Sequence, residues 1–380
     1  MKIAFFADTF RPNIDGVVTA MANLEEGLKK QGHKTEYFVP APQKKEDELQ
    51  GVHYAKSFAF PPYPQYRVVY DGRNIERECE KFNPAAIHCH AMATMAVAAR
   101  TVAKKQGIPL VGTFHTMLPD AVHYITKNQG LQEWGVHLTW NYLAWLYRDF
   151  DVVTSPSEYV KGLLLRHGIE SVVVPGGIDT KKFTPGKLPG EIKEWFEFDG
   201  GKFLFVGRVV KEKNIDYILE LAKSKAWKEG NCRAYIVGEG PYKKEFEAKV
   251  AAAKAAGKIG RHSIFFEGRV ARHVLVGFYR AADVFLFPSK FETQGLVALE
   301  ALACGTPVAA FMNTAAGELV GQGKNGALLG ADDSYEDATR KIIGAAHAKK
   351  KMAAHCRKVA LKFDLVQYSK SVEKIYKRLQ

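Results

Sequence analysis

Short apolar runs alternate with amphipathic stretches along most of the chain. Because continuous Val-, Ile- and Phe-rich runs separated by helical stretches are typical of parallel strands covered on both faces, the pattern predicts doubly wound α/β sheets. Strands are expected at Lys2–Ala7, Thr35–Val39, Ala86–His90, Pro109–Phe114, Val152–Ser155, Val172–Val174, Phe203–Val206, Ala234–Val237, Ile264–Glu267, Val284–Phe287 and Val308–Ala310. Helices are expected at Val18–Gln31, Met92–Gln106, Glu158–His167, Asn214–Ser224 and Tyr242–Ala255.

The strand–helix series runs twice, and the break falls in the Gly- and Pro-rich stretch Pro175–Gly201. We therefore expect an N-terminal Rossmann-like domain over 1–180 and a second one over 181–364. A terminal amphipathic helix within 365–380 is expected to pack back on the first domain. Open α/β sheets bind ligands at the carboxyl ends of their strands, so the predicted fold is two lobes facing each other across a ligand-binding cleft.

The composition is that of a globular protein, with 47% hydrophobic and 25% charged residues in 380. No apolar run approaches the roughly 20 residues of a membrane-spanning helix, and the N-terminus shows no secretory signal. The five cysteines form no CxxC pair, which favours reduced thiols and a cytoplasmic location.

The formal net charge of +13 favours an anionic partner: nucleic acid, acidic lipid or a phosphorylated substrate. Scattered lysines on a solvated surface are the alternative explanation. The chain has no helix-turn-helix, RNP or zinc-finger signature, so nucleic acid is disfavoured, whereas an anionic membrane surface stays open. No metal site is expected, because the histidines, cysteines and acids lack ligand spacing and Asp332 and Asp333 are adjacent rather than in an Asp-x-Asp motif.

The most informative stretch is Ser289–Pro307, which follows a predicted strand, turns through Gly295 and continues as a helix. A helix that begins after a strand offers free N–H groups and a positive dipole end, which suit a diphosphate. Glu292 is expected just before this helix and Glu300 within it. A helical rise over the eight residues would put their carboxylates roughly 12 Å apart, one for a sugar hydroxyl and one for a ribose. An acid complementing the helix dipole and an ordinary acid on the helix face are the alternative interpretation.

Glu292-x7-Glu300 and the following Ala-Leu-Ala-Cys-Gly-Thr-Pro resemble the signature of family 4 of the retaining glycosyltransferases, which have the two-domain GT-B fold. The resemblance implies that Glu292 contacts the donor sugar and Glu300 the nucleotide ribose. It also implies that the backbone amides of Leu296 and Val297, next to Gly295, hold the diphosphate.

A second segment, Phe205–Asn214, resembles the strand-Gly-Arg segment of that family. The resemblance implies that Gly207 lies at the nucleotide and that Arg208 and Lys213 bind the diphosphate. Arginine forks onto phosphate oxygens and lysine supplies a point charge, so together they would neutralise the leaving group. An isolated arginine after a strand would otherwise be assigned to a surface salt bridge.

Two further glycine loops, Val237–Pro241 and Phe266–Val270, match loops of the family and add Gly238 and Arg269 to the expected nucleotide site. By themselves such loops are ordinary tight turns. The first strand is not followed by G-x-G-x-x-G, which disfavours a nicotinamide-dependent dehydrogenase.

In the N-terminal half, Phe10–Gly16 follows the first strand, and the family commonly has two adjacent glycines where this chain has only Gly16. Close approach of the backbone to the donor at Gly16 and a plain strand-to-helix turn both stay open. His115 follows another predicted strand, and the resemblance assigns it to the hydroxyls of the donor sugar. A buried structural histidine is the alternative. The catalytic residues implied are Arg208, Lys213, Glu292 and His115, with retention at the anomeric carbon.

The acceptor is indicated by Thr113–Ile125 and by the Glu292-Thr-Gln-Gly295 variant, which resemble bacterial diacylglycerol glycosyltransferases. Aromatic residues in a predicted helix and in an expected loop, Phe58–Tyr66, suit a membrane interface, although aromatics at helical spacing are more often core. The helix residues are Trp134, Trp140, Tyr142, Trp145, Tyr147 and Arg148.

The predicted function is thus transfer of a hexose from a nucleotide sugar to a membrane glycerolipid, on the inner face of the membrane. A UDP-sugar is favoured over a GDP-sugar as donor, and no cofactor or metal is required. The alternatives are a soluble or polysaccharide acceptor, a GT-B-fold sugar-nucleotide epimerase and a nucleotide-sugar-binding pseudoenzyme.

Overall fold

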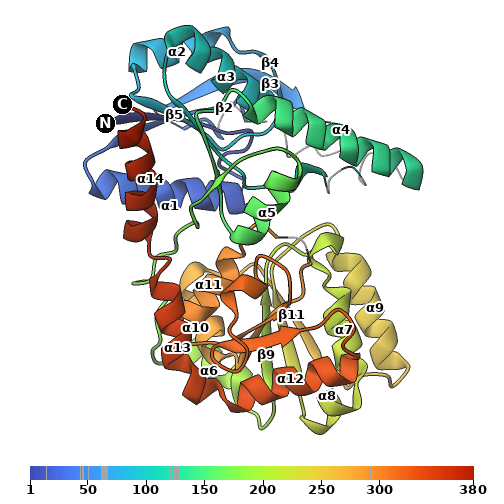
Figure 1. Cartoon of the computed structure of the whole chain (residues 1–380). Helices are drawn as coiled ribbons and strands as arrows, with labels where there is room; N and C mark the ends of the chain where they lie inside the picture. The colour runs from blue at the N-terminus through green and yellow to red at the C-terminus, as the bar shows by residue number, and fades with distance from the viewer. Residues whose placement is uncertain are drawn as a thin grey trace. The chain divides into compact units, whose positions relative to one another are not determined.

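The computed structural model describes residues 1–13, 15–42, 44, 47–49, 51–60, 67–119, 122, 128–290 and 292–380. The chain forms two compact units. Unit 1 contains Met1–Gly177 together with Leu365–Gln380, and unit 2 contains Ile178–Asp364. Each unit is an α/β structure with its own central sheet (Figure 1).

Unit 1 is built on an eight-stranded sheet with the order β4-β3-β2-β1-β5-β6-β7-β8. Neighbouring strands are parallel except for the antiparallel pair β3–β4. The strand order reverses between β1 and β5, and such a switch point is where open α/β sheets bind ligands. The strands are β1 (Lys2–Phe6), β2 (Lys34–Pro40), β3 (Val52–Ala59), β4 (Arg67–Asp71), β5 (Ala86–Cys89), β6 (Leu110–Thr113), β7 (Val152–Ser155) and β8 (Val172–Val173).

The last helix of the chain, α14, packs against α1 of the same unit (Figure 1). The two helices approach closely at Gly27, where a Cβ atom would lie 2.5 Å from Cβ of Ser369. Val372 and Tyr376 of α14 are fully buried in the core beside β1, so this segment completes the unit. The helices of unit 1 are α1 (Gly16–Lys30), α2 (Arg73–Phe82), α3 (Thr94–Gln106), α4 (Gln129–Tyr147), α5 (Glu158–Arg166) and α14 (Leu365–Arg378).

Unit 2 has a six-stranded, all-parallel sheet with the order β11-β10-β9-β12-β13-β14. Counted from the first strand of the unit this is 3-2-1-4-5-6, the order of dinucleotide-binding Rossmann folds, with the switch point between β9 and β12. The strands are β9 (Lys202–Val206), β10 (Arg233–Val237), β11 (Ile264–Gly268), β12 (Val284–Phe287), β13 (Val308–Phe311) and β14 (Gly326–Leu329).

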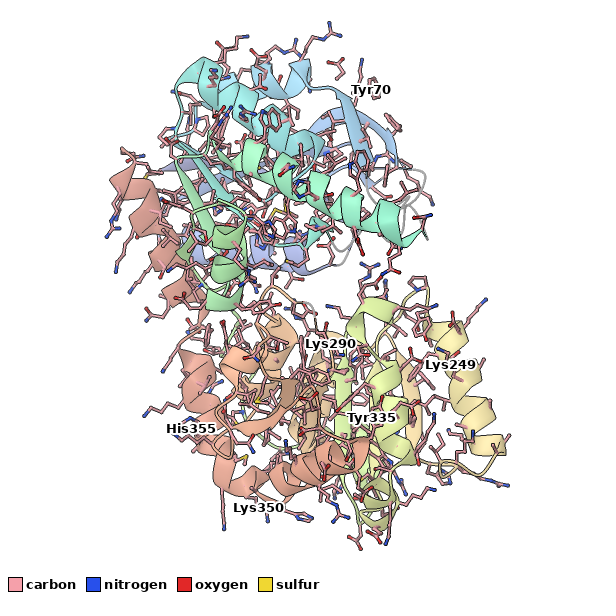
Figure 2. All side chains as sticks on the ribbon, turned by 45° about the vertical axis from the view of Figure 1, so that its right-hand side comes forward. Tyr70, Lys249, Lys290, Tyr335, Lys350 and His355 are labelled. Carbon is pink, nitrogen blue, oxygen red and sulfur yellow. The ribbon has the colours of Figure 1, made fainter. Side chains whose placement is uncertain are left out.

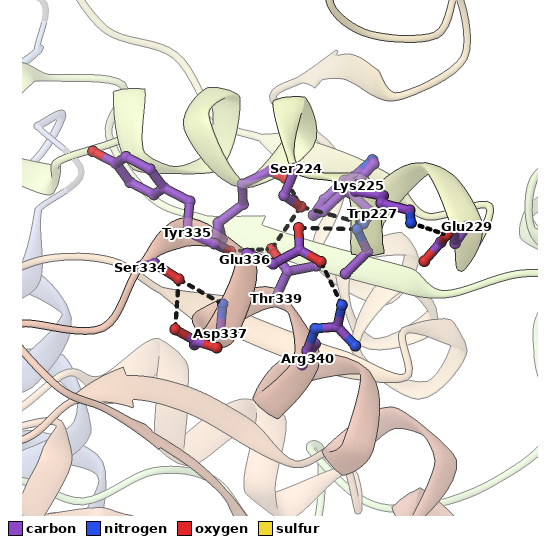
Figure 3. Close-up of polar contacts among 12 residues, drawn as sticks. Ser224, Lys225, Trp227, Glu229, Ser334, Tyr335, Glu336, Asp337, Thr339 and Arg340 are labelled. Carbon is purple, nitrogen blue, oxygen red and sulfur yellow. Dashed lines mark hydrogen bonds and ion pairs between the residues drawn. The ribbon is translucent and has the colours of Figure 1, made fainter.

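Side-chain hydrogen bonds join helix α12 of unit 2 to the corner between two earlier helices. In α12, Glu336 accepts a hydrogen bond from the backbone N–H of Ala226 at 3.1 Å, and the Ser224 hydroxyl donates to Thr339 at 3.0 Å (Figure 3). These bonds fix α12 against the corner between α7 and α8. The α-helices are α6 (Gly190–Lys193), α7 (Asp216–Lys223), α8 (Lys225–Glu229), α9 (Lys243–Ala255), α10 (Arg272–Ala281), α11 (Leu296–Ala303), α12 (Tyr335–His347) and α13 (Lys349–Leu361). Short 3-10 turns lie at η3 (Glu194–Phe196), η4 (Lys211–Lys213) and η5 (Gly317–Leu319).

The predicted doubly wound α/β fold is confirmed, and a strand is found at every predicted position. Strands β3, β4 and β14 were not predicted from the sequence. The expected loop Phe58–Tyr66 is wrong at its start, because Phe58 belongs to β3 and pairs with Val68 of β4. Residues 61–66 lie outside the described residues.

Positive charge is spread over the surface of unit 2. Lys249 and Lys350, for example, are exposed and project from different helices (Figure 2). Within the described part of the chain, no helix is both long enough and apolar enough to cross a membrane.

Candidate active site

Three strand ends of unit 2 are joined by backbone hydrogen bonds at glycines. The N–H of Gly207 donates to Val237 O at 3.0 Å, and the N–H of Gly238 donates to Gly268 O at 2.8 Å. At Gly238, φ is +143° and a Cβ atom would lie 1.9 Å from Gly207 O. No other residue fits this approach, so Gly238 has a structural requirement independent of any ligand.

The segment that follows β9 is tied to the segment that follows β12, across the switch point of the sheet. Asn214 has a φ of +52°, and its side-chain amide donates to Pro288 O at 3.1 Å. The Ser289 hydroxyl donates to Glu212 O at 3.4 Å. These bonds bring η4, with Lys213 at its end, beside the segment that carries Glu292.

Lys213 and Glu292 form a hydrogen-bonded ion pair. Their side chains are 29% and 16% exposed, so the pair is largely shielded but reachable from solvent. Burial lowers the pKa of Lys213 to about 8, the positive charge of Arg208 lowers it as well, and Glu212 opposes the shift. The cations of Arg208 and Lys213 and the carboxylates of Glu212 and Glu292 therefore lie together at the switch point, where an anion would relieve the repulsion between the cations.

Helix α11 begins directly after this pair. Its N-cap is Gly295, with a φ of +89°, and a Cβ atom there would lie 3.0 Å from the ring of Phe287. Because the cap has no side chain to accept hydrogen bonds and the first turn contains no acid, the N–H groups of Leu296 and Val297 begin the helix without side-chain capping from Gly295. Such a helix terminus attracts anions through its N–H groups and dipole.

Glu300 lies within α11 and is 8% exposed. One carboxylate oxygen accepts a hydrogen bond from the Tyr279 hydroxyl at 2.8 Å. Burial raises the pKa of Glu300 to about 7, while the Tyr279 hydrogen bond and the charges of Arg272 and Lys182 lower it. As expected from the sequence, Glu292 precedes the helix and Glu300 lies within it, since α11 begins at Leu296.

Arg269 follows β11 directly, after Gly268 with a φ of +61°, and its side chain is exposed. Unit 2 thus contains all the predicted positions except His115 and Gly16. Among them the structure brings Lys213 and Glu292 into contact, places the charge of Arg208 near Lys213, and packs Gly238 closely against the carbonyl of Gly207.

In unit 1, His115 lies two residues beyond β6, and its Nε2 is 2.8 Å from Nδ1 of His90. The two rings stack with centroids 5.1 Å apart, and His90 stacks on His88 at 4.1 Å. Burial lowers the pKa of His115 to about 4, so the imidazole is neutral at pH 7.

Two acids organise the switch point of unit 1. Asp8, just beyond β1, accepts hydrogen bonds from the backbone N–H groups of Met92, Ala93 and Met95 at 2.7 to 3.0 Å and so holds the start of α3. Asp15 caps α1 by accepting from Val18 N at 2.9 Å. Gly16 is the first residue of α1, and a Cβ atom there would have no neighbour within 4 Å.

Asp8, His90 and Tyr279 were missed by the sequence analysis. His88 and His90 alternate at a strand end, which places both rings on one face, and Asp8 follows the first strand. Those positions could have identified Asp8 and His90 as candidates. Tyr279 offered no signal, because its contact with Glu300 joins two helices that are adjacent only in the fold. Among the described residues, no group of three or more His, Cys, Asp or Glu side chains could hold a metal ion.

A Rossmann-order sheet with cationic side chains and a helix N-terminus at its switch point is typical of nucleotide-binding α/β proteins. Residues 14–182 match the family described as Glycosyltransferase Family 4, and residues 192–363 match the family Glycosyl transferases group 1. The chain belongs to the family 4 glycosyltransferases, which have the GT-B fold, and the predicted family is confirmed.

Two similar proteins are both named alpha-monoglucosyldiacylglycerol synthase. The one from Streptococcus pneumoniae is 30% identical over 343 residues, covering 86% of this chain and 75% of that protein. The one from Acholeplasma laidlawii is 29% identical and covers 86% and 84%. The Anabaena protein HepE, solved in complex with UDP, has the same fold, with a TM-score of 0.77 at 17% identity over the whole of both chains.

Proposed function

We propose that this glycosyltransferase moves a hexose from a UDP-sugar to a membrane glycerolipid with retention at the anomeric carbon. The observation that carries the proposal is the Lys213–Glu292 ion pair, in which Glu292 shortly precedes the start of α11, where Gly295 supplies no side-chain cap. In this proposal unit 2 binds the donor and unit 1 the acceptor.

Arg208 and Lys213 bind the diphosphate together with the N–H groups of Leu296 and Val297. As the bond between the anomeric carbon and the phosphate oxygen breaks, negative charge grows on the diphosphate, and fixed cations stabilise that charge without reorganisation. Glu292 positions Lys213 in the free protein and accepts a hydrogen bond from a donor-sugar hydroxyl in the complex. Gly207, Gly238 and Arg269 lie at the strand ends that line the nucleotide.

Glu300 accepts hydrogen bonds from the ribose hydroxyls, supported by Tyr279. An ionised carboxylate is the best acceptor for two vicinal hydroxyls. Since the pKa of Glu300 is about 7 in the free protein, binding of the ribose favours loss of its proton.

The reaction breaks the bond between the anomeric carbon and the departing diphosphate and forms a bond to the acceptor oxygen on the same face. The hydroxyl proton of the acceptor passes to an oxygen of the departing diphosphate, so no protein base is consumed. His115 contacts a hydroxyl of the donor sugar. The protein supplies orientation and charge stabilisation.

A lipid acceptor is supported by helix α4, which has two apolar faces. Trp140, Leu143, Leu146 and Tyr147 are buried in the core of unit 1. An exposed stripe is formed on another side of the helix by Leu131, Trp134, Leu138 and Trp145, which are 55%, 63%, 43% and 43% exposed. Spacings of three, seven and fourteen residues place these four side chains within one arc of the helix surface.

Cationic groups flank one end of this exposed stripe. The Arg100 guanidinium lies 4.3 Å from the ring centre of Trp145, and Arg148 at the end of α4 is exposed. Tryptophan beside arginine suits the boundary between acyl chains and anionic headgroups. The stripe thus supports peripheral binding to the cytoplasmic face of an anionic membrane. The names of the two similar synthases point to the same class of acceptor.

The test is incubation of the protein with UDP- and GDP-sugars, with and without diacylglycerol in anionic vesicles. The expected product is a glycosylated lipid formed from a UDP-hexose, with the α-configuration of the donor kept. Transfer only to soluble sugars would support the polysaccharide alternative. Interconversion of the sugar nucleotide without transfer would indicate an epimerase, and binding without turnover a pseudoenzyme. Any of these three outcomes contradicts the proposal.

A further inference from the structure

The rings of His88, His90 and His115 form a continuous stack at the carboxyl ends of β5 and β6. Centroid distances are 4.1 Å between the first two rings and 5.1 Å between the last two, with interplanar angles of 25° and 24°. The proposed function uses only His115. The hydrogen bonds around the other two rings determine where each ring carries its proton.

For His88 the proton can be placed from its neighbours. The Thr154 hydroxyl donates to Gly112 O at 3.2 Å, so in its contact of 2.7 Å with Thr113 it is the acceptor. The Thr113 hydroxyl proton is then used, and Thr113 can only accept from Nε2 of His88, 2.6 Å away. His88 therefore carries its proton on Nε2, and its Nδ1 accepts from the Tyr376 hydroxyl at 2.6 Å.

His90 has a different environment, because within the described part of the chain only one of its nitrogens has a partner. The side chain is 3% exposed, Nδ1 lies 2.8 Å from Nε2 of His115, and Nε2 has no hydrogen-bond partner among the described residues. Burial keeps the pKa of His90 well below its usual range, so the ring is neutral with one N–H. A buried N–H without an acceptor is rarer than a buried acceptor without a donor. The proton of His90 thus belongs on Nδ1, where it is donated to His115.

We infer that His90 is a positioning residue that fixes the tautomer of His115, so that His115 carries its proton on Nδ1 and acts on substrate as a hydrogen-bond donor rather than as a base. The contact of 2.8 Å uses Nε2 of His115 as the acceptor, and a neutral imidazole has its only proton on the other nitrogen. The ring of His88, stacked on His90 with centroids 4.1 Å apart, holds the His90 ring in place. The role on substrate rests on the proposed function, whereas the tautomer does not.

The test compares His90→Phe, which keeps an aromatic ring in the stack, with His90→Asn, whose amide can still donate from near the Nδ1 position. Long-range 15N–1H spectra of the ligand-free protein report the protonated nitrogen of each histidine. Wild type and His90→Asn are expected to show His115 protonated on Nδ1. His90→Phe removes the donor, so the proton is no longer fixed on Nδ1, and the 15N shifts of His115 are expected to move toward a mixture of the two neutral forms.

Steady-state kinetics with the nucleotide sugar supply the functional half of the test. His90→Phe is expected to lower kcat/KM by ten- to a hundredfold, and His90→Asn to recover most of the loss. Wild-type His115 protonated on Nε2, or His90→Phe with an unchanged His115 signal, would overturn the inference. If the wild-type protein turned over no nucleotide sugar, the proposed function would fail while the spectra still decided the tautomer.

Discussion

The ammonium group of Lys213 bonds to the carboxylate of Glu292, although the two residues follow different strands of the unit 2 sheet, β9 and β12. The contact spans the point where the strand order reverses. A lysine side chain has four rotatable bonds, and this carboxylate restricts it to one position before any ligand arrives. The ordering entropy is thus lost on folding rather than on binding.

Lys213→Ala should lower kcat by about 100- to 1,000-fold, since it removes a fixed cation from the developing charge of the diphosphate. Arg208→Ala should have an effect of similar size. Lys211→Ala is the matched control, because Lys211 lies in the same short helix but is exposed and pairs with Glu245 at 3.4 Å. Initial rates with the nucleotide sugar provide the measurement, and circular dichroism checks the fold. Equal rates for the Lys213 and Lys211 variants would remove Lys213 from the site.

Glu300 should make the ligand-free protein more stable as the pH falls from about 7 to 4.5. Burial raises its folded pKa to about 7, whereas an unfolded carboxyl titrates near 4.5. Between these values the folded protein keeps a proton that the unfolded chain has lost, so the free energy of unfolding falls as the pH rises, by about 3 kcal/mol at most. Glu300→Gln should remove this dependence in urea unfolding at pH 5 and 7.5. Parallel pH curves for both proteins would contradict the assignment.

Tyr279→Phe should raise the pKa of Glu300 further, because the Tyr279 hydrogen bond lowers that pKa by favouring the carboxylate. Nucleotide affinity, measured by calorimetry, decreases as the pH is lowered and Glu300 gains its proton. In the variant this decrease should begin at a higher pH than in the wild-type protein. An unchanged pH midpoint would show that the tyrosine hydroxyl does not influence the carboxyl.

Gly16→Ala separates stability from donor binding. A Cβ atom at Gly16 meets nothing within 4 Å, and the residue is the first of α1, so the substitution should leave the free energy of unfolding unchanged or raise it by about 0.4–1 kcal/mol. If the donor approaches the backbone at this position, the KM for the nucleotide sugar should rise at least several-fold. An unaltered KM would leave Gly16 as a simple strand-to-helix turn.

The double variant Trp134→Ala/Trp145→Ala should bind anionic vesicles about a hundredfold more weakly or worse, because each indole that inserts into the membrane contributes at least ~1.4 kcal/mol. Trp195→Ala is the control, since Trp195 is 45% exposed but belongs to unit 2. Co-sedimentation with vesicles measures binding, and transfer to detergent-dispersed lipid measures catalysis. Loss of transfer in detergent would show that the stripe acts on the reaction and not on membrane binding.

The parallel strands were predictable from sequence because both faces of each are covered, which leaves uninterrupted apolar runs such as Val284–Phe287. The hairpin β3–β4 was not predictable in this way. Its residues, as in Val52–Ala59, are mostly half-buried or exposed and include lysine and histidine, so they form no continuous apolar run. Strand β14 is short and begins at Gly326, where a Cβ atom would lie 1.9 Å from Val308 O, a constraint visible only in the fold.

In the candidate site, too, some residues could be predicted from the sequence, whereas others are recognised only in the fold. Glu292, Lys213 and Gly295 could be proposed because strand ends and family motifs mark them. The contact between Glu300 and Tyr279 and the stack that ends at His115 depend on how helices and neighbouring strands meet. Sequence patterns set the position of a residue along its own element, but not its partner on another.

Helix α14 supplies Val372 and Tyr376 to the core of unit 1, yet all of unit 2 precedes it in the sequence. During synthesis the ribosome therefore releases the whole of unit 2, an uninterrupted segment, before unit 1 can be completed. The unit translated first is finished last, and until then its face beside α1 is a hydrophobic surface open to chaperones or to premature association.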